Sequence, residues 1–82
     1  MPGHYESEAK RLGVDSRYRI EHETRRYWNS NINQWGEWRE SYWWIRHSDG
    51  KEGDAYGLEG AYWDMLEDSG MAYVVASENE SH

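Results

Sequence analysis

The amino-acid sequence predicts a small α+β domain in which one helix packs on one face of an antiparallel sheet. Two patterns support this fold class: residues 16–28 alternate with a period of two, as in a half-buried strand, whereas residues 58–66 follow the 3.6-residue period of an amphipathic helix. Six Trp and seven Tyr offset the absence of Phe, and such an aromatic content is typical of a folded chain. We expect one domain over 1–82, with the more flexible ends at 1–13 and 77–82.

The first two predicted strands form a hairpin. Over 17–28, Tyr18, Ile20 and His22 share one face and charged side chains fill the other. Residues 29–36 are rich in Asn, which tolerates positive φ and favours a turn. Residues 37–47 are dense in β-favouring aromatic residues. Strands over 17–28 and 37–47 should therefore pair in antiparallel fashion.

The second half of the chain completes the order β-β-α-β. The loop 48–57 contains three glycines, and it leaves room for a short extra strand at 51–56. A helix is predicted over 58–69, ended by Gly70. The apolar run 71–76 predicts a third strand, so the sheet has three strands, or four with the extra one. A short N-terminal helix before Gly13 is the alternative to a loose tail. The helix residues expected in the core are Leu58, Ala61, Tyr62, Met65 and Leu66.

Some of the large aromatic rings should be exposed. One short helix covers only one face of a three-stranded sheet, so rings on the opposite face would form an apolar patch of the kind that marks interaction sites. A homodimer that hides this patch is the alternative. The rings that could contribute to it are Tyr27, Trp28, Trp38, Trp43 and Trp44.

Charge is distributed unevenly along the chain, whose net charge is −7. Residues 1–47 hold eight basic and seven acidic side chains, a net of +1, whereas residues 48–82 hold one basic and nine acidic ones, a net of −8. Such asymmetry bears on partners and association rates. The acidic half either docks on a basic partner or keeps an aromatic-rich protein in solution.

The sequence contains no recognisable catalytic or metal-binding motif. It has no cysteine, which excludes disulfides and thiolate zinc sites. His22 and His47 could meet across the hairpin, but two imidazoles do not complete a metal site. Neither a nucleophile elbow nor a phosphate-binding glycine loop occurs. We therefore predict no enzymatic activity, no cofactor and no metal. Without an apolar membrane span or a secretory signal, the expected location is the cytoplasm, with no membrane partner.

These patterns predict a non-enzymatic, acidic protein-binding module, a small inhibitor or adaptor that docks on the basic site of a nucleic-acid-handling protein. In size, acidity and element order the chain resembles, at the level of the fold, the host-takeover and anti-defence proteins of bacteriophages, anti-CRISPR proteins among them. That resemblance implies an inhibitor that mimics DNA in the host cytoplasm. The expected partner-binding residues are Trp38, Trp43, Trp44, Trp63, Asp64, Glu67 and Asp68.

Two other functions remain open. Arg17, Arg19, Arg25 and Arg26 alternate with Tyr18, Tyr27 and Trp28, a combination used by single-stranded nucleic-acid binders. Glu21 and Glu23 lie within the same strand and oppose phosphate binding, so direct nucleic-acid binding is the weaker prediction. A structural homodimer is the third.

Overall fold

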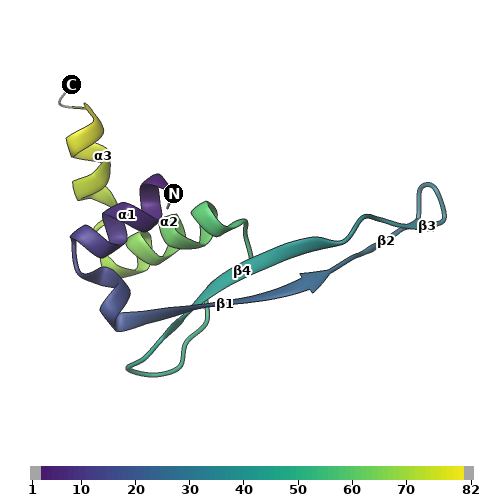
Figure 1. Ribbon diagram of the computed structural model, residues 1–82, viewed down its shortest axis with the longest axis horizontal. Coiled ribbons are helices and arrows are strands. Elements are labelled where there is room, and N and C mark those ends of the chain that lie inside the picture. The colour runs from purple at the N-terminus through teal and green to yellow at the C-terminus, as the bar shows by residue number, and fades with distance from the viewer. Residues whose placement is uncertain (1–2, 81–82) are drawn as a thin grey trace.

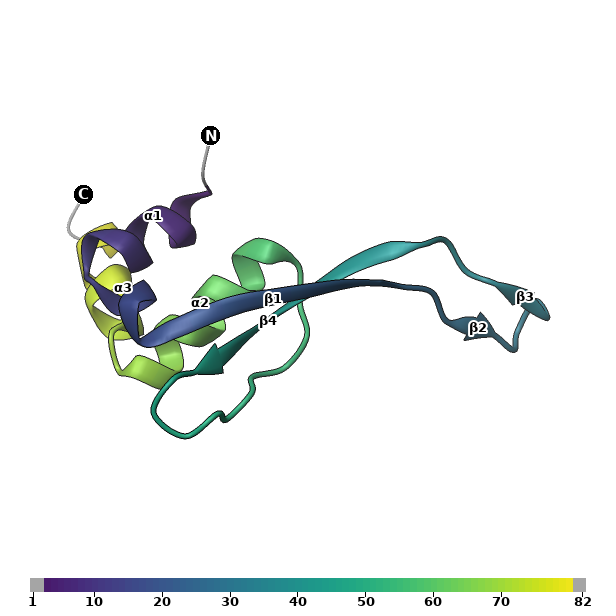
Figure 2. The same ribbon diagram turned by 60° about the horizontal axis from the view of Figure 1, so that its bottom comes forward.

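The computed structural model describes residues 3–80 as an elongated α+β molecule with extents of 47 × 34 × 22 Å. Its helices gather at one end, and a long β-hairpin projects from them (Figures 1 and 2). The element order is α-β-β-β-β-α-α, with a short 3₁₀ turn after the first helix. Among the described residues, no helix is long and apolar enough to cross a membrane.

The N-terminal segment forms helix α1 (His4–Arg11) followed by the 3₁₀ turn η1 (Val14–Arg17). Gly13 lies between them with φ 73°, in the left-handed region that favours glycine. The short N-terminal helix that the sequence allowed is therefore present. The first turn of α1 is hydrogen-bonded to the helix that begins at Leu58, because the Tyr5 backbone N–H donates to Glu59 at 2.8 Å. A carboxylate at this position also interacts favourably with the helix dipole.

The predicted hairpin is confirmed. Strand β1 (Tyr18–Arg25) pairs antiparallel with β4 (Arg39–Arg46) in an unbroken register from Tyr18↔Arg46 to Arg25↔Arg39. Two short strands, β2 (Trp28–Asn29) and β3 (Gln34–Trp35), continue the hairpin beyond this point as a separate two-stranded sheet. Between the two sheets the chain has two residues on the first side and three on the second, so a bulge bends the hairpin.

The segment 51–56 runs along the other edge of β4. The backbone groups of Tyr42 and Tyr56 exchange two hydrogen bonds of 2.8 Å, and a second bridge joins Ile45 to Glu52. The short extra strand expected here does not form, and two isolated bridges take its place.

Helix α2 (Leu58–Ser69) coincides with the predicted helix and ends at Gly70, whose φ of 83° is left-handed. Four of the five residues expected in the core, Ala61, Tyr62, Met65 and Leu66, are buried. Leu58 is 36% exposed, so that part of the prediction is wrong. It is the first residue of the helix, and the apolar stripe begins only one turn later.

The third strand predicted over 71–76 is wrong, because all of these residues except Met71 belong to helix α3 (Ala72–Glu80). The Met71 N–H donates to the Leu66 carbonyl at 2.9 Å, which reverses the chain after α2 and places Val75 in the core. A short apolar run fits a strand or a buried helix equally well, and here tertiary packing decides. The three- or four-stranded sheet in the order β-β-α-β is therefore replaced by two sheets of two strands each.

The core lies at the helical end. Helix α2 is at its centre and packs against α1, η1, α3 and β4. The buried side chains come from every one of these elements and from the start of β1: Ala9, Val14, Tyr18, Trp44, Tyr62, Met65, Leu66 and Val75.

Candidate binding surface

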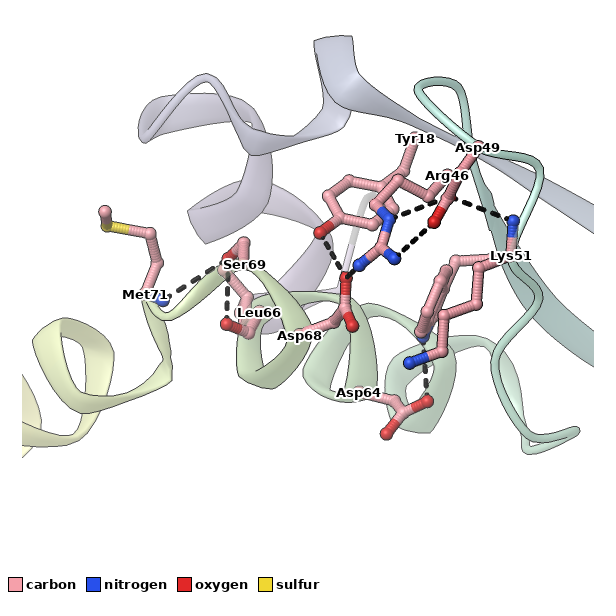
Figure 3. A network of polar contacts seen from close by, with 10 residues as sticks. Tyr18, Arg46, Asp49, Lys51, Asp64, Leu66, Asp68, Ser69 and Met71 are labelled. Carbon is pink, nitrogen blue, oxygen red and sulfur yellow. Dashed lines mark hydrogen bonds and ion pairs between the residues drawn. The ribbon is translucent and has the colours of Figure 1, made fainter.

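A polar network fixes the base of the hairpin to α2 (Figure 3). The Tyr18 hydroxyl donates to Asp68 at 2.6 Å, and the Arg46 guanidinium donates to the same carboxylate oxygen at 2.8 Å. Arg46 also forms two hydrogen bonds to Asp49, at 2.7 and 3.0 Å. Burial and the bond to Asp68 raise the pKa of Tyr18, whereas the bond from Arg46 lowers the pKa of Asp49 to about 2. Charge-assisted bonds of this kind hold the hairpin in one orientation.

Trp44 provides a second attachment. Its ring is 3% exposed and packs edge-on against Tyr18 at a centroid distance of 5.3 Å. Its indole N–H donates to Asp64 at 2.8 Å. Gly53 lies so close that an added Cβ would be 2.2 Å from the indole nitrogen, so this position requires glycine. Packing and hydrogen bonding of Trp44 therefore fix β4 to the helical end of the molecule.

The far end of the hairpin, residues 26–38, is hereafter the hairpin tip. Trp28 and Trp35 face each other across the strands, with ring centroids 5.5 Å apart and planes at 80°. The Gly36 N–H donates to the Tyr27 carbonyl, so the adjacent Trp28–Trp35 pair is a non-hydrogen-bonded one, in which side chains approach most closely. Even so, Trp28 is 51% and Trp35 53% exposed.

Arg26 joins a third ring to this pair. Its guanidinium carbon lies 5.0 Å from the centroid of Trp35 and 4.8 Å from that of Trp38. Cation–π contacts at this distance orient the rings without burying them. Trp38 remains 61% exposed. The Arg26 guanidinium thus lies between the accessible indole rings of Trp35 and Trp38.

The turn at the end of the tip is built by asparagine. The Asn29 side chain accepts the Asn31 N–H at 3.0 Å, and Asn33 has a positive φ of 52°. Both are roles for which Asn is favoured in turns. This geometry leaves Ile32 exposed at the very end of the molecule. The large apolar side chains exposed on the tip are Tyr27, Trp28, Ile32, Trp35 and Trp38.

The tip and the acidic residues occupy different parts of the molecule. The tip itself holds one basic and one acidic side chain, Arg26 and Glu37, and the flanking Arg25 and Arg39 bring residues 25–39 to a net charge of +2. Near the helices, a cavity of about 400 Å³ lies between α2 and the loop after β4. The negative charge there raises the pKa of Tyr56, chiefly through Asp64 and Asp54. The cavity is lined by Trp44, Lys51, Glu52, Gly53, Asp54, Asp64, Glu67 and Asp68.

The seven residues expected to bind a partner do not form one surface. Trp38 belongs to the tip and Glu67 is exposed on α2. Trp44 is buried, and Asp64 and Asp68 bond to groups of the chain itself. The other two are only partly exposed. Trp43 is half-buried on β4, and Trp63 packs on Tyr5 with centroids 4.9 Å apart.

Sequence reasoning missed three members of the tip surface. Trp35 was included in the turn over 29–36, and Ile32 and Arg26 were given no role on the tip. The cross-strand register could have found Trp35, because a four-residue turn after Asn29 places it directly opposite Trp28.

The comparisons with known proteins provide no functional assignment. Scans against family models, curated proteins and solved structures find no match. Among the side chains described, those of residues 3–78, no three His, Cys, Asp or Glu gather in a way that could hold a metal ion.

Proposed function

We propose that this protein is a non-enzymatic binding module, an inhibitor or adaptor that inserts its hairpin tip into an apolar groove of a partner protein. The exposure of three neighbouring Trp rings at the tip carries this proposal. They lie outside the core cluster, so the fold does not require them. Trp, Tyr and Arg are the residue types that dominate binding hot spots.

The tip has the properties of a pre-organised anchor. The Trp28–Trp35 contact and the Arg26 contacts already orient the rings, so binding would cost little side-chain entropy. Complete burial of one large apolar side chain contributes about 1.5–3 kcal/mol. Two or three such rings would supply the anchor of a stable complex.

The acidic side chains around the cavity at the helical end, hereafter the acidic end, have a different part in this proposal. Its charge would attract a basic surface, such as one that handles nucleic acid, and accelerate association. It would act as the inhibitor's steering surface in the cytoplasm of a host. Asp64 and Asp68 are partly buried and bond internally, so this role would fall to the exposed acidic side chains that line the cavity, Glu52, Asp54 and Glu67.

An affinity capture experiment with matched variants tests the proposal. The wild-type chain, a Trp28→Ala/Trp35→Ala variant and a Glu52→Lys/Asp54→Lys/Glu67→Lys variant would be immobilised in parallel in lysate of a candidate host. The proposal expects one protein to be retained by the wild type and lost with the tip variant. With that protein purified, the tip variant should raise the dissociation rate constant at least tenfold, and the Lys variant should chiefly lower the association rate constant. Equal retention by the tip variant would exclude the tip as the anchor.

Single-stranded nucleic acid is a second candidate ligand, favoured by one observation. The Arg26 guanidinium lies between two exposed indoles on a part of the chain with net positive charge, as stacking surfaces for bases require. Arg26→Ala should then weaken binding of a labelled oligonucleotide, and the Lys variant should strengthen it. Absence of oligonucleotide binding at about 50 mM salt would eliminate this candidate.

A further inference from the structure

The outer edge of β1 is an open strand edge. Tyr42 uses its N–H and C=O to bond Tyr56, on the side away from β1. Its partner in the register, His22, belongs to the same non-hydrogen-bonded pair, so the N–H and C=O of His22 also point away from β4. Because hydrogen-bonded and non-hydrogen-bonded pairs alternate along the two strands, the N–H and C=O groups of Ile20 and Thr24 also point away from β4. Among residues 3–80, no backbone hydrogen bond engages them.

Open edges invite pairing with another strand. Proteins commonly block them with charges that repel a second copy, but the charges on β1 have a different arrangement. On the face opposite Ile20 and His22, the strand presents Arg19, Glu21, Glu23 and Arg25 in order, preceded by Arg17. From Arg17 to Glu23 the charges therefore run +, +, −, −. In an antiparallel second copy, each of these charges can lie opposite a charge of the other sign.

We propose that two copies of this chain pair through their β1 edges, antiparallel, with Ile20 opposite Ile20. A twofold axis perpendicular to the sheet relates identical edges in this way. In this register Arg19 lies opposite Glu21 of the second copy and Arg17 opposite Glu23, each twice. All of these pairs are of opposite sign, the arrangement that stabilises neighbouring strands.

The neighbouring registers are disfavoured by charge. A shift that places Ile20 opposite His22 keeps Arg19 opposite Glu23, but it sets Glu21 against Glu21 and Arg17 against Arg25. A further shift that centres the pairing on His22 sets Arg19 against Arg25 and Glu21 against Glu23. Like charges directly opposite each other destabilise a strand pair. Of these three registers, only the one centred on Ile20 sets charges of opposite sign against each other at every position.

Backbone groups are available for this register. The two Ile20 residues exchange both of their hydrogen bonds, and each His22 N–H donates to the Tyr18 carbonyl of the other copy. The Tyr18 N–H is already used, since it donates to Asp15. Ile20 is only partly buried in the single chain, and the second Ile20 covers it further.

This dimer has a consequence that rests on the proposed function. The two hairpins extend in opposite directions from the axis, and at about 3.3 Å per residue the 11 residues from Ile20 to Asn31 span at most about 36 Å. The two tips would therefore lie up to about 70 Å apart, and the dimer would present two anchors to two partner molecules.

Charge exchange provides the first test. The mass of the wild type would be measured by sedimentation velocity from about 1 to 200 µM, where we expect a shift from 9.8 kDa toward twice that value. Arg19→Glu and Glu21→Arg should each be monomeric alone, because each creates like-charge pairs across the axis. Mixed in equal amounts, they should form a heterodimer, because every pair is then of opposite sign. The Arg19→Glu/Glu21→Arg double variant should dimerise with itself.

Proline substitution provides the second test and fixes the register. His22→Pro removes an N–H that faces the second copy and none that bonds β4, which an edge strand tolerates. It should weaken dimerisation at least tenfold. Thr24→Pro is the matched control: its N–H also faces outward, but in this register it lies opposite Ser16, before the strand begins. That variant should dimerise like the wild type, and circular dichroism would verify both folds.

Two results would overturn the proposal. One is a wild-type chain that stays monomeric up to about 200 µM. The other is a dimer that survives both charge variants but is lost in Trp28→Ala/Trp35→Ala, which would place the interface at the tip. Failure of the β1 dimer leaves single-chain binding by the tip untouched, and the two proposals are thus tested separately.

Discussion

Single side chains of α2 decide whether the helical end holds together. Leu66 is completely buried at the centre of the core, whereas Leu58 is partly exposed at the helix start. The 3.6-residue period gave both the same role, because periodicity reports the face of a helix and not the length over which that face is covered. The structure therefore separates two leucines that the sequence treats alike.

Truncation of these two leucines should have different consequences. We expect Leu66→Ala to lower the free energy of unfolding by about 2–5 kcal/mol, because it leaves a cavity in the core. Leu58→Ala should lower it by about 1 kcal/mol or less, because its side chain is already partly hydrated. Urea denaturation of both variants would measure the difference. Equal losses would show that α2 is packed differently.

Asp49 should make part of the stability sensitive to acid. The hydrogen bonds from Arg46 hold its pKa at about 2 in the folded chain, below the usual value of about 4 for an aspartate. A lowered pKa stabilises the folded state above that usual value, and the contribution disappears as the pH falls from about 4 to about 2. Asp49→Asn should therefore be less stable than the wild type at pH 6 but not at pH 2.

Urea titrations at a series of pH values would measure this dependence. Glu52→Gln removes an exposed carboxylate from the same loop and is the control. A constant difference between Asp49→Asn and the wild type over pH 2–6 would contradict the assigned role of Arg46.

At the level of elements, local patterns predicted the hairpin and the middle helix. Period-two alternation in β1, the Asn-rich turn and the glycine that ends α2 are all local signals, and each is present in the structure. The segment 71–76 was mispredicted because its two valines favour strands locally, while Val75 is buried only when the segment coils back onto α2. No local signal contains that information.

The tip should be removable without unfolding the rest. Arg25 and Arg39 are a hydrogen-bonded pair, the flanking geometry that a two-residue Asn-Gly turn requires. Replacement of residues 26–38 by Asn-Gly should therefore leave the chain folded, with a free energy of unfolding within about 1 kcal/mol of the wild type. Circular dichroism and urea denaturation would test this. Loss of cooperative unfolding would mean that the tip supports the core.

At the level of the whole molecule, aromatic exposure and acidity are separated. The residues expected from the sequence to bind a partner combined four Trp rings with three acidic side chains of the second half of the chain. Folding buries Trp44 and half-buries Trp43 and Trp63, so the accessible Trp rings are those at the far end of the hairpin. Which rings remain accessible depends on tertiary packing, and composition alone could not predict it.

This separation predicts two distinguishable kinetic effects on a purified partner. Raising the salt concentration from about 50 to 500 mM shortens the Debye length to about 4 Å and should lower the association rate constant several-fold. The dissociation rate constant should change little, since the apolar contacts of the tip are not screened. Stopped-flow or biosensor kinetics would measure both rates. Salt-independent association would indicate that the acidic end serves only solubility.

The most direct test of the central claim compares two chains that share the same folded base. The wild type and the chain with Asn-Gly in place of residues 26–38 would be titrated against the captured partner by isothermal calorimetry. If the tip is the anchor, the shortened chain will show affinity at least a hundredfold weaker, although its base remains folded. Affinity within a factor of about three of the wild type would contradict the claim and assign binding to the helical end.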